Sequence, residues 1–592
     1  MKDLKRLFDF PYYQLENFDL DKALVTKYDG EWIATSTRSY IDQANQISRG
    51  LLKLGIQAKD KVALISTSNR TEWNIMDIGT MQIGAQNVPI YPTISEDDYA
   101  YILNHSESKL CFVSDKEVYD KVMAIKDQVP HLEQVYTFDD IEAAKSWKEV
   151  QELGKDESSQ DQVKQIMASI TEDDVATIIY TSGTTGKPKG VLLSHKNIAS
   201  NAINSSTRLP TETGRANALS FLPICHIYER MLHYLYQING VTIYFAESIE
   251  AISDNLKEVK PDVMSAVPRL LEKVYDKIIA KGSDLSGIKK ALFFWAVDLG
   301  HAYEPYEANG WWYEFKLSIA KKLIFSKWQE GLGGNLKVIA SGSAALQPRL
   351  ARVFNAAGIR VMEGYGLTET SPVIAVNDMR DHGFKIGTVG KPLPETIVKI
   401  AEDGEILVKG PQVMKAYYKD EEKTKESLED NGFFHTGDIG EIDSEGFLRI
   451  TDRKKEIFKT SGGKYVAPQI LENTMKQSRF IEQIMVIGEG EKMPAALIQP
   501  NFEFVKEWAE RKGIEIGETP KEIATNEKLI ARIEEEVIYY NKRFGNWEKV
   551  KKFELTGEIW TIEEGHLTPT LKLKRRNIKN RFLESYNRIY GH

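Results

Sequence analysis

Residues 180–190, YTSGTTGKPKG, constrain this chain more than any other stretch, because they have the composition of an anion-binding loop. They include four Ser and Thr hydroxyls, three glycines and two lysines, and they directly follow the apolar run 175–179. Glycine lets backbone N–H groups come close to a ligand, and hydroxyl and ammonium groups supply further donors. Such a loop is suited to a polyphosphate.

The spacing of this loop excludes a Walker-type P-loop. That motif needs G-x-x-x-x-G-K-[ST], but Gly183 and Gly186 are too close together, and Pro188 follows Lys187. Residues 191–194 read as a strand and proline suits a turn, so we expect the loop to join two strands. A surface turn without a ligand is the competing interpretation of these residues alone.

The overall composition indicates a soluble, cytoplasmic enzyme. The 592 residues can bury more than one core. A net charge of −9 argues against nucleic-acid binding. The two cysteines, Cys111 and Cys225, fit a reducing compartment better than a disulfide framework. We find no signal peptide, and no apolar run is long enough for a transmembrane helix.

The alternation of expected strands and helices near the N-terminus predicts an α/β fold. Residues 61–66, 86–91 and 109–114 read as buried strands, and residues 71–83 as an amphipathic helix between the first two. Strands that alternate with helices form mainly parallel sheets covered by helices. In contrast, the aromatic-rich segment 290–328 is expected to supply core and helix-packing surface. It leaves open a contact with the entrance for an apolar substrate or with a bilayer.

The glycine- and hydroxyl-rich loop resembles the phosphate-binding signature of the adenylate-forming superfamily, which comprises acyl-CoA synthetases, luciferases and peptide-synthetase adenylation domains. Within it, residues 222–230, LPICHIYER, are similar to the LPLAHIFER of long-chain acyl-CoA synthetases. Residues 567–576, LTPTLKLKRR, nearly match their LTPTFKLKR. The resemblance covers nearly the whole chain, with the motifs in the expected order.

This resemblance implies the domain organisation. A large N-terminal AMP-binding domain, residues 1–452, would consist of layered α/β sheets with a small β subdomain. A mobile α+β cap, residues 453–592, would follow it. Lys455 matches the hinge position, and the glycines after Ser461 supply the mobile backbone that a boundary needs.

The resemblance also implies which residues bind the nucleotide. Those expected to hold the phosphates are Thr181, Ser182, Gly183, Thr184, Thr185 and Lys189. Those expected around the adenine and α-phosphate are Gly342, Ser343, Ala344, Glu363, Gly364, Tyr365, Gly366 and Thr368. Those expected at the ribose or beside the hinge are Asp438, Arg453, Lys455 and Lys459. Small residues let a purine lie against the backbone, and a tyrosine ring can stack on it.

Four residues, one of them Thr181 again, would carry the chemistry. Glu369 and Thr181 would bind the Mg²⁺ that accompanies ATP, since carboxylate and hydroxyl oxygens are hard ligands. His226 would lie beside the carboxylate and α-phosphate, and Lys572 would activate the acid. Each motif alone also allows a structural interpretation: a structural histidine, a capped turn, or a solvated basic linker.

The implied reaction has two steps. A long-chain fatty carboxylate attacks ATP to give acyl-AMP and pyrophosphate, and coenzyme A then displaces AMP. The cofactors and co-substrates would be ATP, Mg²⁺ and coenzyme A. Two alternatives stay open: a ligase that delivers the acyl group to a carrier protein in trans, and a catalytically silent relative of the fold. The sequence also leaves open a homodimer and a peripheral membrane contact.

Overall fold

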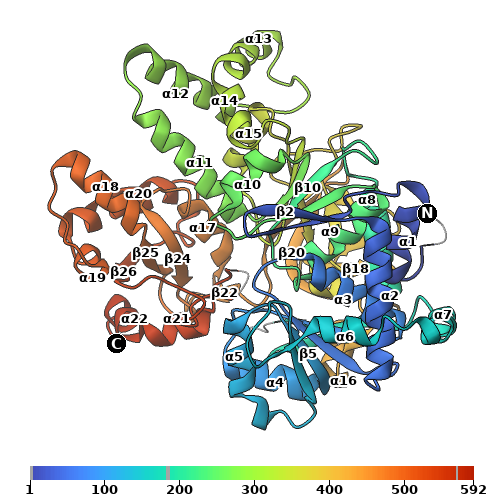
Figure 1. Cartoon of the computed structure of the whole chain (residues 1–592). Helices are drawn as coiled ribbons and strands as arrows, with labels where there is room; N and C mark the ends of the chain where they lie inside the picture. Colours follow the sequence, from blue (N-terminus) through green and yellow to red (C-terminus); the bar gives the residue numbers. More distant parts are fainter. Residues whose placement is uncertain (1–3, 182–186, 569–570) are drawn as a thin grey trace. The chain divides into compact units, whose positions relative to one another are not determined.

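The structure, a computed structural model, describes residues 4–181, 187–568 and 571–592 (Figure 1). The chain divides into two compact units. Unit 1 comprises Met1–Lys399, Leu407–His435 and Asp443–Leu448. Unit 2 comprises Ile400–Ile406, Thr436–Ile442 and Arg449–His592. The predicted domain boundary between residues 452 and 453 stays a prediction.

The first sheet of unit 1 has eight strands in the order β19-β9-β8-β4-β3-β5-β6-β7. Its bounds are β3 Lys61–Ile65, β4 Gln86–Ile90, β5 Ser108–Val113, β6 Gln134–Thr137, β7 Lys145–Ser146, β8 Val175–Thr181, β9 Lys189–Ser194 and β19 Ala416–Tyr417. From β8 to β7 all neighbours are parallel, whereas β9 pairs antiparallel with β8 and β19. The parallel α/β arrangement predicted from the sequence is confirmed.

Both faces of this sheet are buried. Alternate side chains of a strand point to opposite faces. Accordingly, Val62 and Leu64 of β3 belong to the largest core, together with α3 (Thr71–Gln82), α8 (His195–Ser206) and α9 (Ile227–Ile238). Ala63 and Ile65 belong to a second core, together with α4 (Glu96–Ser106) and α5 (Lys116–Ala124). Burial on both sides explains the continuous apolar runs of these strands.

The second sheet of unit 1 has nine strands in the order β16-β15-β14-β13-β12-β10-β11-β1-β2. Its bounds are β1 Leu24–Tyr28, β2 Glu31–Thr35, β10 Asn217–Ser220, β11 Thr242–Phe245, β12 Val263–Ala266, β13 Val338–Ser341, β14 Val361–Gly366, β15 Val373–Val376 and β16 Lys391–Pro392. The strands from β1 to β14 in this order pair in parallel, and β15 turns back antiparallel on β14. The motifs on β13 and β14 therefore end at the same edge of the sheet.

A buried polar network ties α9 to the first sheet. Arg230 of α9 lies 2.6 Å from Asp77 of α3, measured from Nη2 to Oδ1. Arg230 also donates to the hydroxyl of Thr177 on β8 over 2.8 Å. Both charged side chains are almost completely buried, so each compensates the other away from water. This pairing fixes the helix that begins immediately after His226.

A bundle of helices forms a separate core in unit 1. It contains α11 (Pro268–Ser283), α12 (Gly287–His301), α13 (Trp311–Ala320), a π-helical turn (Lys321–Phe325), α14 (Ser326–Gly331) and α15 (Pro348–Ala356) (Figure 1). Phe293, Phe325 and Trp328 are buried in it, as predicted for the aromatic-rich segment. Trp311, Trp312 and Phe315 are instead exposed.

A four-stranded sheet, β17-β18-β20-β21, carries residues of both units. Its strands span Ile397–Ile400, Glu405–Lys409, Phe434–Ile442 and Leu448–Arg453. Unit 2 continues with the pair β22 (Phe458–Lys459) and β23 (Tyr465–Val466). It also has a three-stranded sheet of β24 (Ile481–Ile487), β25 (Ala495–Pro500) and β26 (Lys552–Leu555). Its helices include α17 (Pro468–Met475), α18 (Phe502–Lys512), α21 (Arg575–Arg581) and α22 (Leu583–Tyr590).

The polar residues 520–542 of unit 2 do not form one continuous helix. Residues 520–542 form two helices, α19 (Pro520–Ala524) and α20 (Glu527–Asn541). The Asn526 side chain accepts hydrogen bonds from the backbone N–H groups of Lys528 and Leu529, which starts a new helix at that point. None of the helices in the described part of the chain combines the length and the apolarity that crossing a bilayer requires.

Candidate functional site

The hydroxyl-rich loop closes the hairpin of β8 and β9, as its sequence predicts. Thr181 at the end of β8 pairs with Lys189 at the start of β9. The ring of Tyr180 is buried beneath this hairpin, and its hydroxyl lies 2.8 Å from Nδ1 of His105. The predicted phosphate-binding residues Ser182, Gly183, Thr184 and Thr185 lie outside the described residues.

Glu369, the predicted metal ligand, is connected to this hairpin through Tyr417. The Tyr417 hydroxyl donates to Oε1 of Glu369 over 2.8 Å. The Nζ of Lys189 lies 5.6 Å from the centroid of the Tyr417 ring, which fits a cation–π contact. Tyr417 itself pairs with Val191 of β9. The structure thus brings Lys189 and Glu369 to one tyrosine, although they are far apart in the sequence, and Thr181 is the strand partner of Lys189.

Among the described residues, no group of three or more His, Cys, Asp or Glu side chains could hold a metal ion by itself. Mg²⁺ that accompanies a nucleotide is typically bound through one or two carboxylates and the phosphates. Glu369 is half-buried and already hydrogen-bonded, so its carboxylate is held in one orientation. The donor set of Glu369 and Thr181 therefore fits a nucleotide-borne Mg²⁺.

His226 caps the N-terminus of α9. Its Nδ1 accepts a hydrogen bond of 3.1 Å from the backbone N–H of Tyr228. In the neutral ring the proton therefore resides on Nε2. The edge of the His226 ring faces Tyr91, with the centroids 6.4 Å apart. The structural role as a helix cap and the predicted role at the substrate are compatible, because they use different nitrogen atoms.

Tyr228 joins His226 to the predicted adenine loop. Its hydroxyl donates to the carbonyl oxygen of Ala340, on β13, over 3.0 Å. A Cβ at Gly342 would lie 3.4 Å from the Tyr228 ring, so the backbone of Gly342 rests against that ring. Ser343 follows with a left-handed φ of +70°, and Ala344 is exposed. The small residues at 342–344 thus lie against a half-buried aromatic ring.

Glu363, Gly364, Tyr365 and Gly366 all lie on β14. Glu363 pairs with Ser341 of β13, which puts Gly364 beside the turn at 342–344. Burial raises the pKa of the Glu363 carboxyl to about 8. Gly366 needs its lack of a side chain, because a Cβ there would lie 1.8 Å from the carbonyl oxygen of Pro372. Thr368 is buried in a short turn that follows the strand.

In unit 2 two of the residues predicted to contact the ribose, Asp438 and Arg453, lie next to each other. Asp438 is buried, and its Oδ1 lies 3.5 Å from Nε of Arg453. The backbone N–H of Lys454 donates to the carbonyl oxygen of Gly437 over 2.8 Å, which aligns the two strands. The carboxylate and the guanidinium are therefore adjacent, as expected for groups that share a nucleotide.

Lys455, the predicted hinge residue, and Lys459, predicted to lie near the nucleotide, occupy different positions in unit 2. Lys455 is exposed in a turn after β21, whereas Lys459 lies on β22 opposite Tyr465. The Lys459 Nζ is 4.6 Å from the Tyr465 ring centroid. Residues 458–459 are a strand, so the spacing of four between the two lysines is not a helical turn.

Lys572 lies on a tight turn that is closed by its own backbone. Leu567 and Leu573 form an isolated antiparallel bridge. The backbone N–H of Lys572 donates to the hydroxyl of Thr568 over 3.0 Å. Leu571, the residue before it, has a left-handed φ of +60°. Lys572 belongs to unit 2, whereas the hydroxyl-rich hairpin belongs to unit 1.

Three residues on from Lys572, Arg575 has a structural role that sequence reasoning missed. The sequence suggests surface charge or a contact with coenzyme A phosphates for it. Instead, Arg575 forms ion pairs with Glu456 at 2.9 Å and with Glu472 at 2.7 Å. Glu456 immediately follows Lys455, the predicted hinge residue. Arg575 therefore connects the turn after β21 to the segment that carries Lys572.

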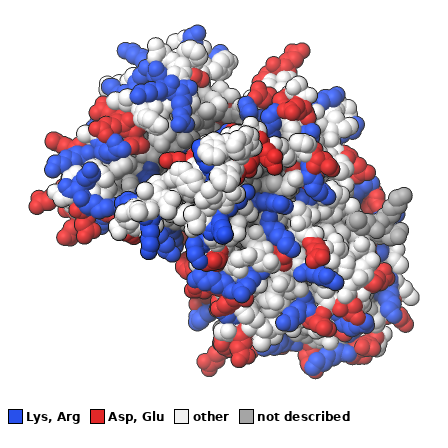
Figure 2. Space-filling model, turned by 90° about the horizontal axis from the view of Figure 1, so that it is seen from above, with Lys and Arg blue, Asp and Glu red and all other residues white. Residues whose placement is uncertain are grey.

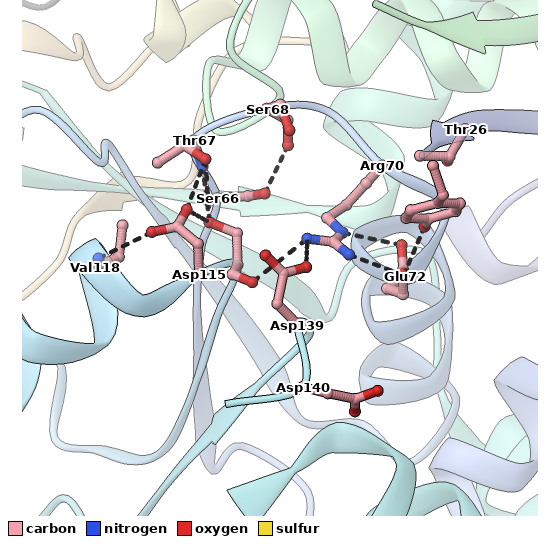
Figure 3. A network of polar contacts seen from close by, with 12 residues as sticks. Thr26, Ser66, Thr67, Ser68, Arg70, Glu72, Asp115, Val118, Asp139 and Asp140 are labelled. Atoms are coloured by element: carbon pink, nitrogen blue, oxygen red, sulfur yellow. Dashed lines mark hydrogen bonds and ion pairs between the residues drawn. The ribbon is translucent and has the colours of Figure 1, made fainter. Parts of the chain in front are cut away.

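A second polar region lies at the carboxyl ends of β3, β5 and β6 (Figure 3). Arg70 lies between Glu72 and Asp139, with ion pairs of 3.0 and 2.9 Å. The open pocket beside it is lined by Asp115, Lys116, Glu117, Asp139, Asp140, Ile141, Glu142 and Ala143. Its five carboxylates repel a polyphosphate, and none of the predicted site residues lines it.

Comparison with known proteins supports the family resemblance seen in the sequence. Residues 14–418 match the AMP-binding enzyme family, and residues 455–556 match the AMP-binding enzyme C-terminal domain. The chain is 34% identical to long-chain-fatty-acid–CoA ligase FadD15 of Mycobacterium bovis, across 98% of this chain and 96% of that protein. It is 31% identical to long-chain-fatty-acid–CoA ligase 1 of Cavia porcellus, across 95% of this chain and 82% of that protein.

Solved structures with the same fold include the anthranilate CoA ligase AuaEII with anthranoyl-AMP. Its TM-score is 0.70 at 18% identity, with 97% of each chain covered. The Mycobacterium tuberculosis fatty acyl CoA synthetase has a TM-score of 0.61 at 21% identity, with 98% of this chain and 99% of that chain covered. At these identities the structures establish the fold, and the curated relatives establish the family. The chain belongs to the AMP-binding enzyme family, among the long-chain-fatty-acid–CoA ligases that it matches over nearly its whole length.

Proposed function

We propose that this chain activates a long-chain fatty acid with ATP and transfers the acyl group to coenzyme A. The first step yields acyl-AMP and pyrophosphate, and the second yields acyl-CoA and AMP. The observation that carries the proposal is the 34% identity to a long-chain-fatty-acid–CoA ligase over 98% of the chain. The contacts of Lys189 and Glu369 with Tyr417, and the pairing of Lys189 with Thr181, support it.

The main barrier in the first step is electrostatic, because a carboxylate attacks a phosphate that already carries charge. Lys189 and the hydroxyl-rich hairpin would bind the departing pyrophosphate, and Lys572 would neutralise charge at the α-phosphate and the carboxylate. Thr181 and Glu369 would hold the Mg²⁺ that accompanies ATP, whose charge offsets that of the phosphates. Nε2 of His226 would donate to a substrate oxygen, since Nδ1 is engaged by the helix.

Different predicted residues would contact the base and the ribose of the nucleotide. Its adenine would rest on the turn at 342–344 and on Tyr365, and its ribose hydroxyls would donate to Asp438. The two steps need different surroundings: a lysine-bearing closed site for adenylation, and then an approach for the thiol. Rotation of the cap, residues 453–592, about Lys455 would satisfy both needs.

The separate half-reactions test this division of roles. Lys572→Ala should abolish fatty-acid-dependent pyrophosphate release, yet retain thioester formation from supplied acyl-AMP. Lys574→Ala, two residues away, is the matched control and should retain both activities. Equal loss of the two half-reactions in Lys572→Ala would contradict the proposed role of this lysine.

AMP release measured over acids of graded length, with and without coenzyme A, tests the substrate. Multiple turnovers that require coenzyme A are expected. Acyl-AMP that accumulates and is discharged only by a carrier protein would favour the alternative ligase. A homodimer and a peripheral membrane contact are additional proposals, and the second is developed below.

A further inference from the structure

The helix α13 and the π-helical turn after it are apolar on two opposite sides. The inner side contributes Leu317, Ala320 and Phe325, all fully buried in the helical core of unit 1. The outer side carries four large apolar residues at helical spacing, which we call the outer stripe: Trp312, Phe315, Ile319 and Leu323. A helix of a water-soluble protein normally has one apolar side and one polar side.

The outer stripe is truly exposed. The exposed fractions are 53% for Trp312, 53% for Phe315, 37% for Ile319 and 51% for Leu323. Trp312 and Phe315 stack on each other, with centroids 5.6 Å apart and planes inclined by 16°, and Trp311 packs edge-on against Trp312. Single exposed apolar residues are common, but an ordered group that includes three aromatic rings indicates an interaction site.

The charges around the stripe are positive. Between residues 311 and 325 the chain carries Lys316, Lys321 and Lys322 but only one acid, Glu314. The Nζ of Lys316 lies 5.3 Å from the Trp312 ring centroid, so a cation is held directly beside the stripe. Glu314 follows Trp312 by two residues, about 200° around the helix, and its Oε1 is buried. This local excess contrasts with the net charge of −9 of the whole chain.

Figure 2 shows the molecule from above, relative to the view in Figure 1, and α12 and α13 lie at the top of Figure 1. Uncharged surface and basic side chains alternate on this face, and acidic side chains are also present. Tryptophan and phenylalanine bordered by lysine is the composition of helices that lie in a lipid interface. The aromatic rings enter the headgroup region, while the long lysine side chains reach the phosphates.

We propose that the outer stripe of α13 docks onto the surface of an anionic lipid bilayer. The helix lies parallel to the membrane, with Trp312 and Phe315 in the headgroup layer and Lys316 and Lys322 against lipid phosphates. The occupant is a bilayer rather than a second copy of the chain, because a symmetric contact would bring the lysines of two copies together. The inference concerns where the enzyme sits, so its failure would leave the proposed reaction intact.

Co-sedimentation of the full chain with vesicles tests this inference. The wild type should bind vesicles of phosphatidylcholine and phosphatidylglycerol, and bind vesicles of phosphatidylcholine alone more weakly. The double variant Trp312→Glu/Phe315→Glu should weaken binding to the anionic vesicles by about tenfold or more, since it removes apolar contact and adds repulsion. Added salt should weaken the wild-type binding, because the lysine contribution is screened.

Trp547 provides a matched control elsewhere in the chain. It is 52% exposed, and the Nζ of Lys464 lies 5.9 Å from its ring centroid, so it closely resembles Trp312 with Lys316. Trp547→Glu should bind vesicles as the wild type does. The second variant, Lys316→Glu/Lys322→Glu, changes only exposed or half-exposed charges. It should lose preference for the anionic vesicles even if the aromatic variant folds poorly.

Several results would overturn the proposal. One is the absence of wild-type binding to anionic vesicles, and another is equal binding by the wild type and both double variants. Equal weakening by Trp547→Glu would show that the effect is not local to the stripe. Sedimentation velocity adds a last criterion: a wild-type dimer that the aromatic variant converts to a monomer, with unchanged lipid binding, would assign the stripe to self-association instead.

Discussion

The hydroxyl of Tyr417 donates a 2.8 Å hydrogen bond to the carboxylate of Glu369, and the two residues are 48 positions apart in the sequence. Tyr417 is fixed by its own strand pairing with β9, directly after the hydroxyl-rich hairpin. The orientation of the predicted metal ligand therefore depends on the same hairpin that carries the predicted phosphate loop. A carboxylate that is held before the nucleotide arrives loses less freedom on binding Mg²⁺.

Tyr417→Phe removes this hydrogen bond and keeps the ring under Lys189. We expect the half-saturating Mg²⁺ concentration for pyrophosphate release to rise about fivefold, equivalent to about 1 kcal/mol for a hydrogen bond to a charged acceptor that water can partly replace. Thermal stability should change little. Tyr418→Phe, at the adjacent position, is the control. An unchanged Mg²⁺ dependence in Tyr417→Phe would refute the orienting role.

The pH dependence of stability should report on Glu229, which is buried in the LPICHIYER segment. Its two carboxylate oxygens each accept a 2.6 Å hydrogen bond, one from Ser220 and one from Ser265. Burial raises the pKa of Glu229 to about 7, from 4.5 when it is exposed. Between these values the folded protein holds a proton that the unfolded chain releases, so stability falls as pH rises from about 4.5 to about 7.

Glu229→Gln lacks this titration. Urea unfolding at each pH measures the free energy of unfolding of the variant relative to that of the wild type. This difference should rise by about 1 to 3 kcal/mol in favour of the variant between about pH 5 and about pH 8. Other groups titrate equally in both proteins, so the difference isolates Glu229. The exposed Glu422→Gln should show no such trend. A stability difference that is constant with pH would contradict the assignment.

Gly366 and Gly364 allow a direct test of close backbone approach on β14. A Cβ at Gly366 would lie 1.8 Å from the carbonyl oxygen of Pro372, whereas one at Gly364 would lie 3.4 Å from Val376. Gly366→Ala should therefore displace the turn that carries Thr368 and Glu369, and weaken ATP binding about tenfold or more. Gly364→Ala requires only a small adjustment. Isothermal titration calorimetry compares the ATP affinities of the two variants. Equal affinities would contradict the greater need for glycine at position 366.

The sequence predicts well the features that are set by local chemistry. The alternation of apolar strands with helices identifies the sheet of β3, β4 and β5, and proline with glycine identifies the hairpin after β8. Both follow from backbone preferences that act over a few residues. The helix boundary at Asn526 also has a local cause, but its cap became clear only from the observed hydrogen bonds.

Long-range contacts could not be read from the sequence in the same way. Tyr417 and Glu369 meet only because β19 adds to the edge of the first sheet. The exposed stripe of α13 lies in a segment predicted to be mainly core, because periodicity alone does not tell which side of a doubly apolar helix is covered. Similarly, Arg575 stands in a basic run with no local sign of its partners, which lie 103 and 119 residues away.

Arg575 gives the last prediction, on both stability and activity. Burial alone would lower the pKa of its guanidinium, but Glu472 and Glu456 outweigh burial and raise that pKa, so the group stays charged. Arg575→Met leaves two largely buried carboxylates without their cation. The cost to stability should be about 3 kcal/mol, as for other buried ion pairs that lose one partner. Lower pH should reduce this cost, because protonation removes the uncompensated charge.

The activity of the variant should change in a particular way. Arg575 joins the turn after Lys455 to the segment of Lys572, so its loss should slow pyrophosphate release more than thioester formation from supplied acyl-AMP. Arg575→Lys should restore part of both stability and rate. Arg576→Met alters the exposed neighbouring residue and is the matched control. If Arg575→Met and Arg576→Met unfold at the same urea concentration and adenylate at the same rate, the ion pairs do not position Lys572.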